Sequence, residues 1–352
     1  MKASGNTAEW TEALDALQVF TSNEPNVRVT RTSLSVPVDS RERFYGLVAD
    51  VQRRLTEEVL GERVDGAKRI SSLCAAMRQK LLSMTGLAQL KLPATLEAFL
   101  ADPASALDKP SFGLVLDAVQ GGCDAEELER RARLDIPAFG ETLERCAYEM
   151  WAYFGIVAAL EPVRFYAVYS PDTVEVHAVD ADSVTIGSQI SSPERRIPEA
   201  AFATRDGRVF AMKTEAAREL DFYGIKIQRR RDTSAGGNTQ GLLGHRVLLL
   251  YGLDELEHIG VVADREKLKL VCPDLFCEVL QPTDMAYPAF VSTFVERINS
   301  VRSRRPVQVI CKDAGGSFPE GMLEDASVAP LTCNVVGYEE TELTRIAGLL
   351  AY

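Results

Sequence analysis

The architecture of this chain is decided most clearly by residues 110–169, which read PSFGLVLDAVQGGCDAEELERRARLDIPAFGETLERCAYEMWAYFGIVAALEPVRFYAVY. A short apolar helix is predicted first, and it stops at Gly121–Gly122. Asp124 is a good N-cap for a second helix, whose first turn is acidic. The sequence Leu134–Pro137 predicts the end of this second helix, because a residue before proline is pushed out of helical geometry.

A third helix is predicted to follow Pro137, which suits the first turn of a helix. Its apolar residues are spaced by three and four, which places them on one face. Gly155 is a plausible stop. Two strands are predicted after it, at Ile156–Leu160 and Val163–Val168, and Glu161-Pro162 joins them. The apolar residues of the third helix are Phe139, Leu143, Cys146, Ala147, Met150 and Phe154.

Helix, helix, turn, long helix and hairpin in this order resemble a winged helix-turn-helix domain over about residues 110–169. The turn Leu134–Phe139 is similar to the loop before a recognition helix. The resemblance is one of fold, without signature residues, and it covers only this stretch. It implies a third helix of the kind that enters the DNA major groove. An ordinary helical subdomain that leads into a sheet is the alternative interpretation.

The charges of this stretch disfavour DNA as a partner. Between Asp108 and Arg164 there are eleven acidic and six basic residues, a balance of −5. The start of the third helix offers Glu141 and no base, whereas phosphate contacts need lysine or arginine. A winged helix here is therefore predicted to contact protein, or to dimerise, rather than to bind DNA strongly.

The composition is that of a soluble, intracellular protein. The chain has 352 residues, a net charge of −12, 46% hydrophobic and 26% charged residues, enough for two or three domains. No apolar run approaches the ~20 residues that cross a bilayer, and the N-terminus lacks a signal core. Seven cysteines, an odd number, fit reduced thiols. We therefore expect a cytoplasmic location and no membrane contact, and the abundance of Arg and Ala suggests a bacterial or phage genome.

Residues 1–106 are predicted to form a helical region with an extended arm. In Thr21–Ser40 apolar and polar residues alternate, which indicates a strand or an arm that packs on a neighbour. Between Asn26 and Leu92 twelve bases face seven acids, so this basic segment precedes the acidic one. Opposed segments of this kind can pair within one molecule or between subunits, although a solvated helix face is the commoner explanation.

The complete prediction is an α+β fold in four parts. The helical region 1–106 precedes the winged-helix-like unit 107–169. Recurrent turn signals then predict an antiparallel β-rich domain over 170–283, as a sheet or small barrel. A small α/β region over 284–352 completes the chain.

Two glycine-rich loops and two arginine clusters are candidates for binding anions or partners. Backbone amides of a glycine loop after a strand can hold an anion, but neither loop matches a phosphate-binding or dinucleotide motif. Solvated charge beside a loop is the usual explanation for the arginines. The candidate residues are Arg229, Arg230, Arg231, Arg302, Arg304, Arg305, Gly315 and Gly316.

No catalytic motif, metal site or cofactor site is predicted. The C-terminal thiols are too widely spaced for a structural zinc site, and buried reduced cysteines are the simpler explanation. A carboxylate beside His258 could do acid–base work, but no nucleophile motif accompanies it. An enzyme is not excluded, since catalytic residues need only converge in space. The thiols are Cys272, Cys277, Cys311 and Cys333, and the histidines are His177, His245 and His258.

The preferred hypothesis is a non-catalytic, multidomain interaction or assembly protein that acts through protein–protein contacts and self-association. The first alternative is a bacterial or phage DNA-associated transcriptional regulator, in which the basic N-terminal helices and arginine clusters would touch DNA. The second is a structural subunit of a phage-like assembly, suggested by the extended arm. The third is an enzyme with a phosphate-binding glycine loop at residues 314–321.

Overall fold

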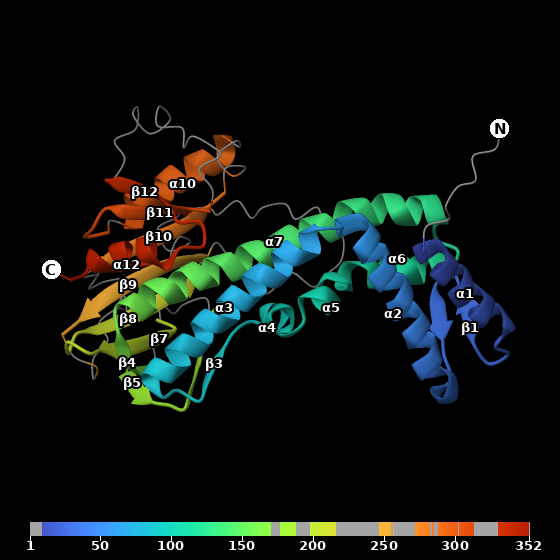
Figure 1. Cartoon of the computed structure of the whole chain (residues 1–352), viewed down its shortest axis with the longest axis horizontal. Helices are drawn as coiled ribbons and strands as arrows, with labels where there is room; N and C mark the ends of the chain where they lie inside the picture. Colours follow the sequence, from blue (N-terminus) through green and yellow to red (C-terminus); the bar gives the residue numbers. More distant parts are fainter. Residues whose placement is uncertain are drawn as a thin grey trace, which may run out of the picture. The chain divides into compact units, whose positions relative to one another are not determined.

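The computed structural model confirms the predicted α+β class, with helices in the N-terminal part and a large mixed sheet after them (Figure 1). It describes residues 9–169, 177–187, 198–215, 246–254, 256, 272–281, 284, 288–301, 303–312 and 330–351. None of the helices in this part of the chain combines the length and the apolar composition that crossing a bilayer requires.

The chain divides into two compact units, and neither is a continuous stretch of sequence. Unit 1 comprises Met1–Ser72 and Thr95–Ala147, together with residues 231–242, which lie outside the described residues. Unit 2 comprises Leu73–Ala94, Tyr148–Arg230 and Leu243–Tyr352. The helices α3 and α7 each contribute residues to both units. The four predicted domain boundaries stay predictions.

Unit 1 is built around α2, against which α1, α5 and α6 pack. The apolar residues of α2 recur every three or four positions, and Phe44, Val48 and Leu55 are buried. This is the spacing that gives one apolar stripe on a helix. The helices are α1 Glu9–Asn23, α2 Val38–Leu60, α3 Arg63–Thr85, α4 Ala94–Ala101, α5 Pro103–Leu107 and α6 Lys109–Val119.

The predicted extended arm is a short hairpin. Strands β1 (Arg28–Thr30) and β2 (Ser33–Ser35) pair antiparallel, with Val29 opposite Leu34. The alternation therefore does indicate strands. The two strands fold back on each other instead of extending as an arm. A turn between Thr30 and Ser33 joins them, and in it the Thr30 hydroxyl accepts a hydrogen bond from the Ser33 amide at 3.0 Å.

The predicted helix break at Leu134–Pro137 is wrong, because α7 runs without interruption from Ala125 to Ala159 and contains Pro137. The apolar residues keep the same helical spacing before and after the proline, and Ile136 and Phe139 are buried on either side of it. Burial of these apolar residues outweighs the cost of a proline inside a helix, about 3 kcal/mol. The turn required by the winged-helix resemblance is therefore absent from these residues.

The predicted strand Ile156–Leu160 is also wrong, since Ile156 to Ala159 form the last turn of α7. All of Ile156, Val157 and Ala158 are buried, and a short run that is apolar on every side cannot distinguish a buried helix from a strand. The second predicted strand is confirmed as β4, which belongs to the large sheet rather than to an isolated two-stranded wing.

The core of unit 2 is an eight-stranded sheet with the order β12-β11-β10-β9-β8-β7-β4-β5. Neighbouring strands from β5 to β10 are antiparallel, whereas β10, β11 and β12 are mutually parallel. One sheet therefore runs through both the predicted β-rich region and the predicted α/β region. The strands are β4 Pro162–Tyr169, β5 His177–Asp180, β7 Ala200–Thr204, β8 Val209–Glu215, β9 Arg246–Leu253, β10 Leu275–Leu280, β11 Val307–Cys311 and β12 Leu331–Val335.

Helix α10 (Pro288–Val301) packs on one face of this sheet, where Phe294 and Ile298 contact a core that includes Phe276 and Val309. Helix α12 (Glu340–Gly348) follows β12. A separate small sheet joins β3 (Gln89–Lys91) in parallel to β6 (Ser183–Thr185). Both sheets lie within unit 2.

Candidate functional site

A pocket of about 250 Å³ opens in unit 1 between the end of α2, the start of α3 and α5. Thr56 and Leu107 line it and are almost completely buried, with exposed fractions of 3% and 1%. The half-buried Asp108 lies beside them, and Arg53 and Lys68 supply charged groups nearer the solvent. A concave site that combines apolar walls with a few polar groups is the usual form of a binding site.

A glycine fixes the reversal of the chain that forms one wall of this pocket. Gly61 ends α2 with a φ of +52°, and its N–H donates to the Glu57 carbonyl at 2.9 Å. This left-handed conformation is one that glycine adopts without a steric cost. The chain then enters α3 at Arg63, so that Val64 and Lys68 face the same pocket as Thr56.

Asp108 lies at the junction of α5 and α6, where its backbone and not its side chain holds the two helices. Its carbonyl oxygen accepts hydrogen bonds from the Gln52 amide side chain at 2.9 Å and the Ser111 hydroxyl at 2.6 Å. Its carboxylate makes no capping hydrogen bond to α6. By contrast, the Asp102 carboxylate caps α5 by accepting from the Ser105 amide at 3.1 Å.

Burial raises the pKa of the Asp108 carboxyl above its ordinary value, and the negative charges of Glu57 and Asp102 raise it further. The Thr56 hydroxyl lowers the pKa, and Arg53 lowers it less. Among the described residues the buried Thr56 hydroxyl has no hydrogen-bond partner of standard geometry, and Asp108 belongs to no ion pair. The pocket therefore holds a partly desolvated carboxylate without a cation beside it.

The two cations of the pocket are already engaged by other carboxylates. Arg53 donates to Asp50 at 2.6 Å and to Glu57 at 3.2 Å. Lys68 lies 3.6 Å from Asp65. Neither of these bases neutralises Asp108, so its carboxylate faces a net negative environment.

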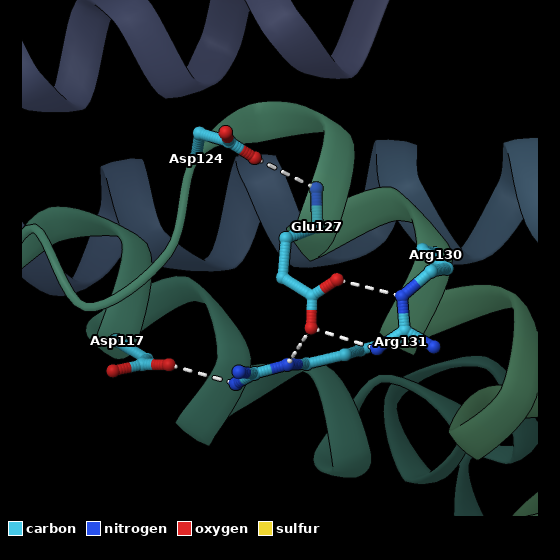
Figure 2. Close-up of polar contacts among 5 residues, drawn as sticks. All are labelled: Asp117, Asp124, Glu127, Arg130 and Arg131. Carbon is cyan, nitrogen blue, oxygen red and sulfur yellow. Dashed lines mark hydrogen bonds and ion pairs between the residues drawn. The ribbon is translucent and has the colours of Figure 1, made fainter.

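Figure 2 shows a denser network of charges at the start of α7. Asp124 accepts a hydrogen bond from the Glu127 amide at 2.9 Å and so caps the helix as predicted. The Glu127 carboxylate accepts from Arg130 at 2.6 Å and Arg131 at 2.8 Å. Arg131 also donates to Asp117 of α6 at 2.8 Å. These arginines are thus held by carboxylates of their own unit rather than presented to a phosphate.

We expect the Glu127 carboxyl to titrate with a pKa of about 2 instead of 4.5, because Arg130 and Arg131 both bind its ionised form. Its folded pKa is below the unfolded value. Its contribution to stability is therefore complete above pH 4.5 and is lost as the pH falls toward 2. Carboxyl ¹³C NMR measures this titration, and Arg130→Gln together with Arg131→Gln should return the midpoint toward 4.5. An unchanged midpoint in that variant would contradict the network.

The structure describes only Arg304 and Arg305 among the predicted site residues. Arg304 lies before β11 and forms an ion pair with Asp274 at 3.0 Å. The same carboxylate accepts from the Gly252 amide at 2.6 Å, so this contact links segments of the sheet region of unit 2. Arg305 is partly buried beside it in the sequence. The remaining predicted residues, Arg229, Arg230, Arg231, Arg302, Gly315 and Gly316, lie outside the described residues.

Sequence reasoning missed the pocket in unit 1. The one local signal was the pair of aspartates that precede helix starts in Asp102-Pro103 and Asp108-Lys109-Pro110. Both fit the N-terminal pattern of a helix. The difference between them, one side chain that caps and one that does not, is visible only when α2 and α3 are folded against α5.

Unit 2 buries several ionisable side chains that serve its packing. The Glu199 carboxylate accepts from the Thr214 hydroxyl at 2.7 Å and from the Thr214 amide at 3.2 Å. Burial raises the pKa of Glu199, and Lys213 is one of the groups that oppose the shift. Burial also raises the pKa of the Tyr153 phenol, with Glu149 and Glu278 adding to the effect. Hydrogen bonding is what makes such burial tolerable.

All seven cysteines lie in the described residues and none forms a disulfide bond there, while their reduced state stays a prediction. Cys311 and Cys333 come closest, with 3.8 Å between their sulfur atoms on the paired strands β11 and β12. In the described part of the chain no three side chains of His, Cys, Asp or Glu come together as metal ligands.

Comparison with known proteins adds no relative: no protein-family model, no curated protein and no solved structure matches this chain. Inference about function therefore depends on the residues themselves.

Proposed function

We propose that this protein is a non-catalytic interaction or assembly protein that acts through protein–protein contacts and self-association. The observation that carries the proposal is an exposed apolar stripe at the start of α2. Val38 is 73% exposed and Tyr45 is 49% exposed. They are seven residues apart, which places them two turns apart on one side of the helix, and the exposed Ala49 continues the same side.

This stripe, Val38–Tyr45–Ala49, is turned away from the core of unit 1. The adjoining side of α2 carries the buried residues Phe44 and Val48. The Tyr45 ring meets the edge of the Phe44 ring, with 5.2 Å between the ring centroids. The Tyr45 side chain therefore packs on the buried Phe44 ring, and its exposed part offers apolar area that a partner can bury.

The charges on the stripe favour a second copy of the chain as the partner. Arg41 and Glu42 lie between Val38 and Tyr45, both are exposed, and neither forms an ion pair with another described residue. In a two-fold contact the same surface meets itself, so Arg41 of one copy can meet Glu42 of the other. An antiparallel pair of α2 helices would thus match apolar with apolar and opposite charges with each other.

Val38→Asp together with Tyr45→Asp is expected to convert a dimer into a monomer, because two carboxylates would be buried against apolar groups. Size-exclusion chromatography with light scattering measures the mass over a range of concentrations. Leu134→Asp is the matched control, since it places a carboxylate at another exposed apolar position, on α7.

A charge swap makes this test specific to the contact. Arg41→Glu alone should weaken the dimer, and Arg41→Glu with Glu42→Arg should restore it. A wild-type chain that stays monomeric at the highest soluble concentration would refute self-association through α2. A dimer that is indifferent to the Asp substitutions would place the contact elsewhere.

The other hypotheses have less support among the described residues. DNA binding by the acidic segment is disfavoured because Arg130, Arg131 and Arg133 are paired with carboxylates at 2.6–2.9 Å, so the regulator hypothesis depends on the basic N-terminal helices and the arginine clusters alone. The enzyme hypothesis depends on residues 314–321, which lie outside the described residues. A subunit of a phage-like assembly remains compatible with the proposal, since it also requires self-association.

A further inference from the structure

We propose that the pocket between α2, α3 and α5 receives a single cationic side chain, lysine or arginine, from a protein partner, with Asp108 as its counter-ion. The inference deepens the proposed function and rests on it, because it supplies the chemistry of one protein–protein contact. Three features of the pocket carry it: its size, its charge and the position of the Asp108 carboxylate.

The size of the pocket suits one long side chain. Its volume is about 250 Å³, below the range of about 300–1,000 Å³ that small-molecule and cofactor sites occupy. Val64, Ala104 and Leu107 supply apolar wall. Lysine and arginine carry a methylene stem that can cover such a wall and a charged end that can pair with a carboxylate.

The charge of the pocket selects a cation. Glu57 and Asp102 add negative potential at the Asp108 carboxyl, and only Arg53 opposes them electrostatically. Arg53 is held by Asp50 and Glu57, so it is not placed to neutralise Asp108. A cation that entered the pocket would therefore relieve both the desolvation of Asp108 and its repulsion by neighbouring carboxylates.

Apart from the Thr56 hydroxyl, which lowers the pKa of Asp108, no group of this unit uses the Asp108 carboxylate as a cap or as an ion-pair partner among the described residues. Asp108 stands at the start of α6, where an aspartate ordinarily accepts hydrogen bonds from the helix amides. Asp102 and Asp124 do so at the starts of α5 and α7, whereas Asp108 does not. A carboxylate that is kept partly desolvated, without a cation and without a helix to cap, is the pattern of a binding group that sacrifices some stability for function.

The experiment is a titration with side-chain analogues of arginine and lysine. n-Butylguanidinium and n-butylammonium are added to the full chain, n-butanol serves as the neutral analogue, and saturation-transfer NMR of the small molecule reports binding. We expect both cations to bind at least about tenfold more tightly than n-butanol, and Asp108→Asn to remove this preference. Asp15→Asn, an exposed carboxylate of α1, is the control that should change nothing.

Two further readouts separate binding from folding. Asp108→Asn is expected to keep or raise its thermal midpoint, because it removes a desolvated charge and no capping bond. Ala104→Trp fills the pocket without altering Asp108 and should also abolish binding of the cations. Binding of n-butanol equal to that of the cations, or full cation binding by a folded Asp108→Asn chain, would overturn the inference.

The outcome is independent of the α2 stripe. A monomeric chain that binds n-butylguanidinium through Asp108 would end the self-association proposal and keep the pocket. The converse result is a wild-type dimer that becomes monomeric with Val38→Asp and Tyr45→Asp and binds the cations no better than n-butanol. That result would support self-association and contradict the pocket proposal.

Discussion

Replacing Pro137 with alanine is expected to raise the free energy of unfolding by about 2–3 kcal/mol, because proline costs about 3 kcal/mol relative to alanine inside a helix. Pro137 lies more than two turns inside α7, so alanine would restore an N–H donor and remove the clash with the carbonyl of Arg133. Urea denaturation followed by far-UV circular dichroism measures the change.

Pro110→Ala is the matched control, because Pro110 lies in the first turn of α6. Proline is well tolerated there, since the missing N–H would have no partner within the helix. A stabilisation by Pro137→Ala no larger than that of the control would mean that the helix begins near Pro137. That result would revive the helix–turn–helix interpretation of residues 134–139.

The second large effect is expected at Gly155, where α7 approaches α12 within unit 2. A Cβ atom on Gly155 would lie 2.4 Å from Leu343 Cδ1 and 3.4 Å from Met77 Cε. Both neighbours are fully or almost fully buried, so the larger side chain of Gly155→Val has no space to enter. We expect a loss of about 3 kcal/mol in the free energy of unfolding.

A double-mutant cycle with Leu343→Ala tests the cause. Leu343→Ala alone should cost about 2–5 kcal/mol through the cavity it leaves. Together the two substitutions should cost at least about 1 kcal/mol less than their sum, because valine fills part of that cavity. Gly113→Val is the control, since a Cβ there would meet nothing within 4 Å. Strict additivity would show that Gly155 and Leu343 do not meet.

The sequence was informative where one helix face is apolar throughout its length. The spacing from Phe44 to Leu55 predicts α2, and the spacing from Phe139 to Phe154 predicts the second half of α7. The helix break was predicted wrongly because Pro137 is a weaker signal than the apolar spacing on either side of it. Ile136 and Phe139 are on the same stripe as Leu128 and Ala132, and this continuity across the proline was the signal for one helix.

The individual strands of unit 2 could be predicted, but their pairing into one sheet could not. β9 pairs with β10 and β10 pairs in parallel with β11, so the antiparallel and parallel parts join at a single strand. The buried runs Val247–Tyr251 and Val307–Cys311 lack the polar alternation that would indicate which face is exposed. Pairing between such strands depends on contacts that are distant in sequence.

The pocket was beyond sequence reasoning for a similar cause. Thr56 lies on α2, Lys68 on α3 and Asp108 in the turn between α5 and α6, and no spacing along the chain brings them together. An aspartate shortly before a proline is typical of a helix cap, and Asp102 does cap α5 immediately before Asp108 in the same segment. Only the tertiary arrangement reveals that the carboxylate of Asp108 is not used as a cap.

The division between the two units falls inside helices, at residues 72 and 73 of α3 and at residues 147 and 148 of α7. A truncation at either point would cut through a run of intact helical hydrogen bonds and would leave new unsatisfied termini. Neither half can therefore be obtained by shortening the gene at one place. A fragment study of this protein has to join two distant segments with an artificial linker, and evolutionary exchange of either unit as a cassette would meet the same obstacle.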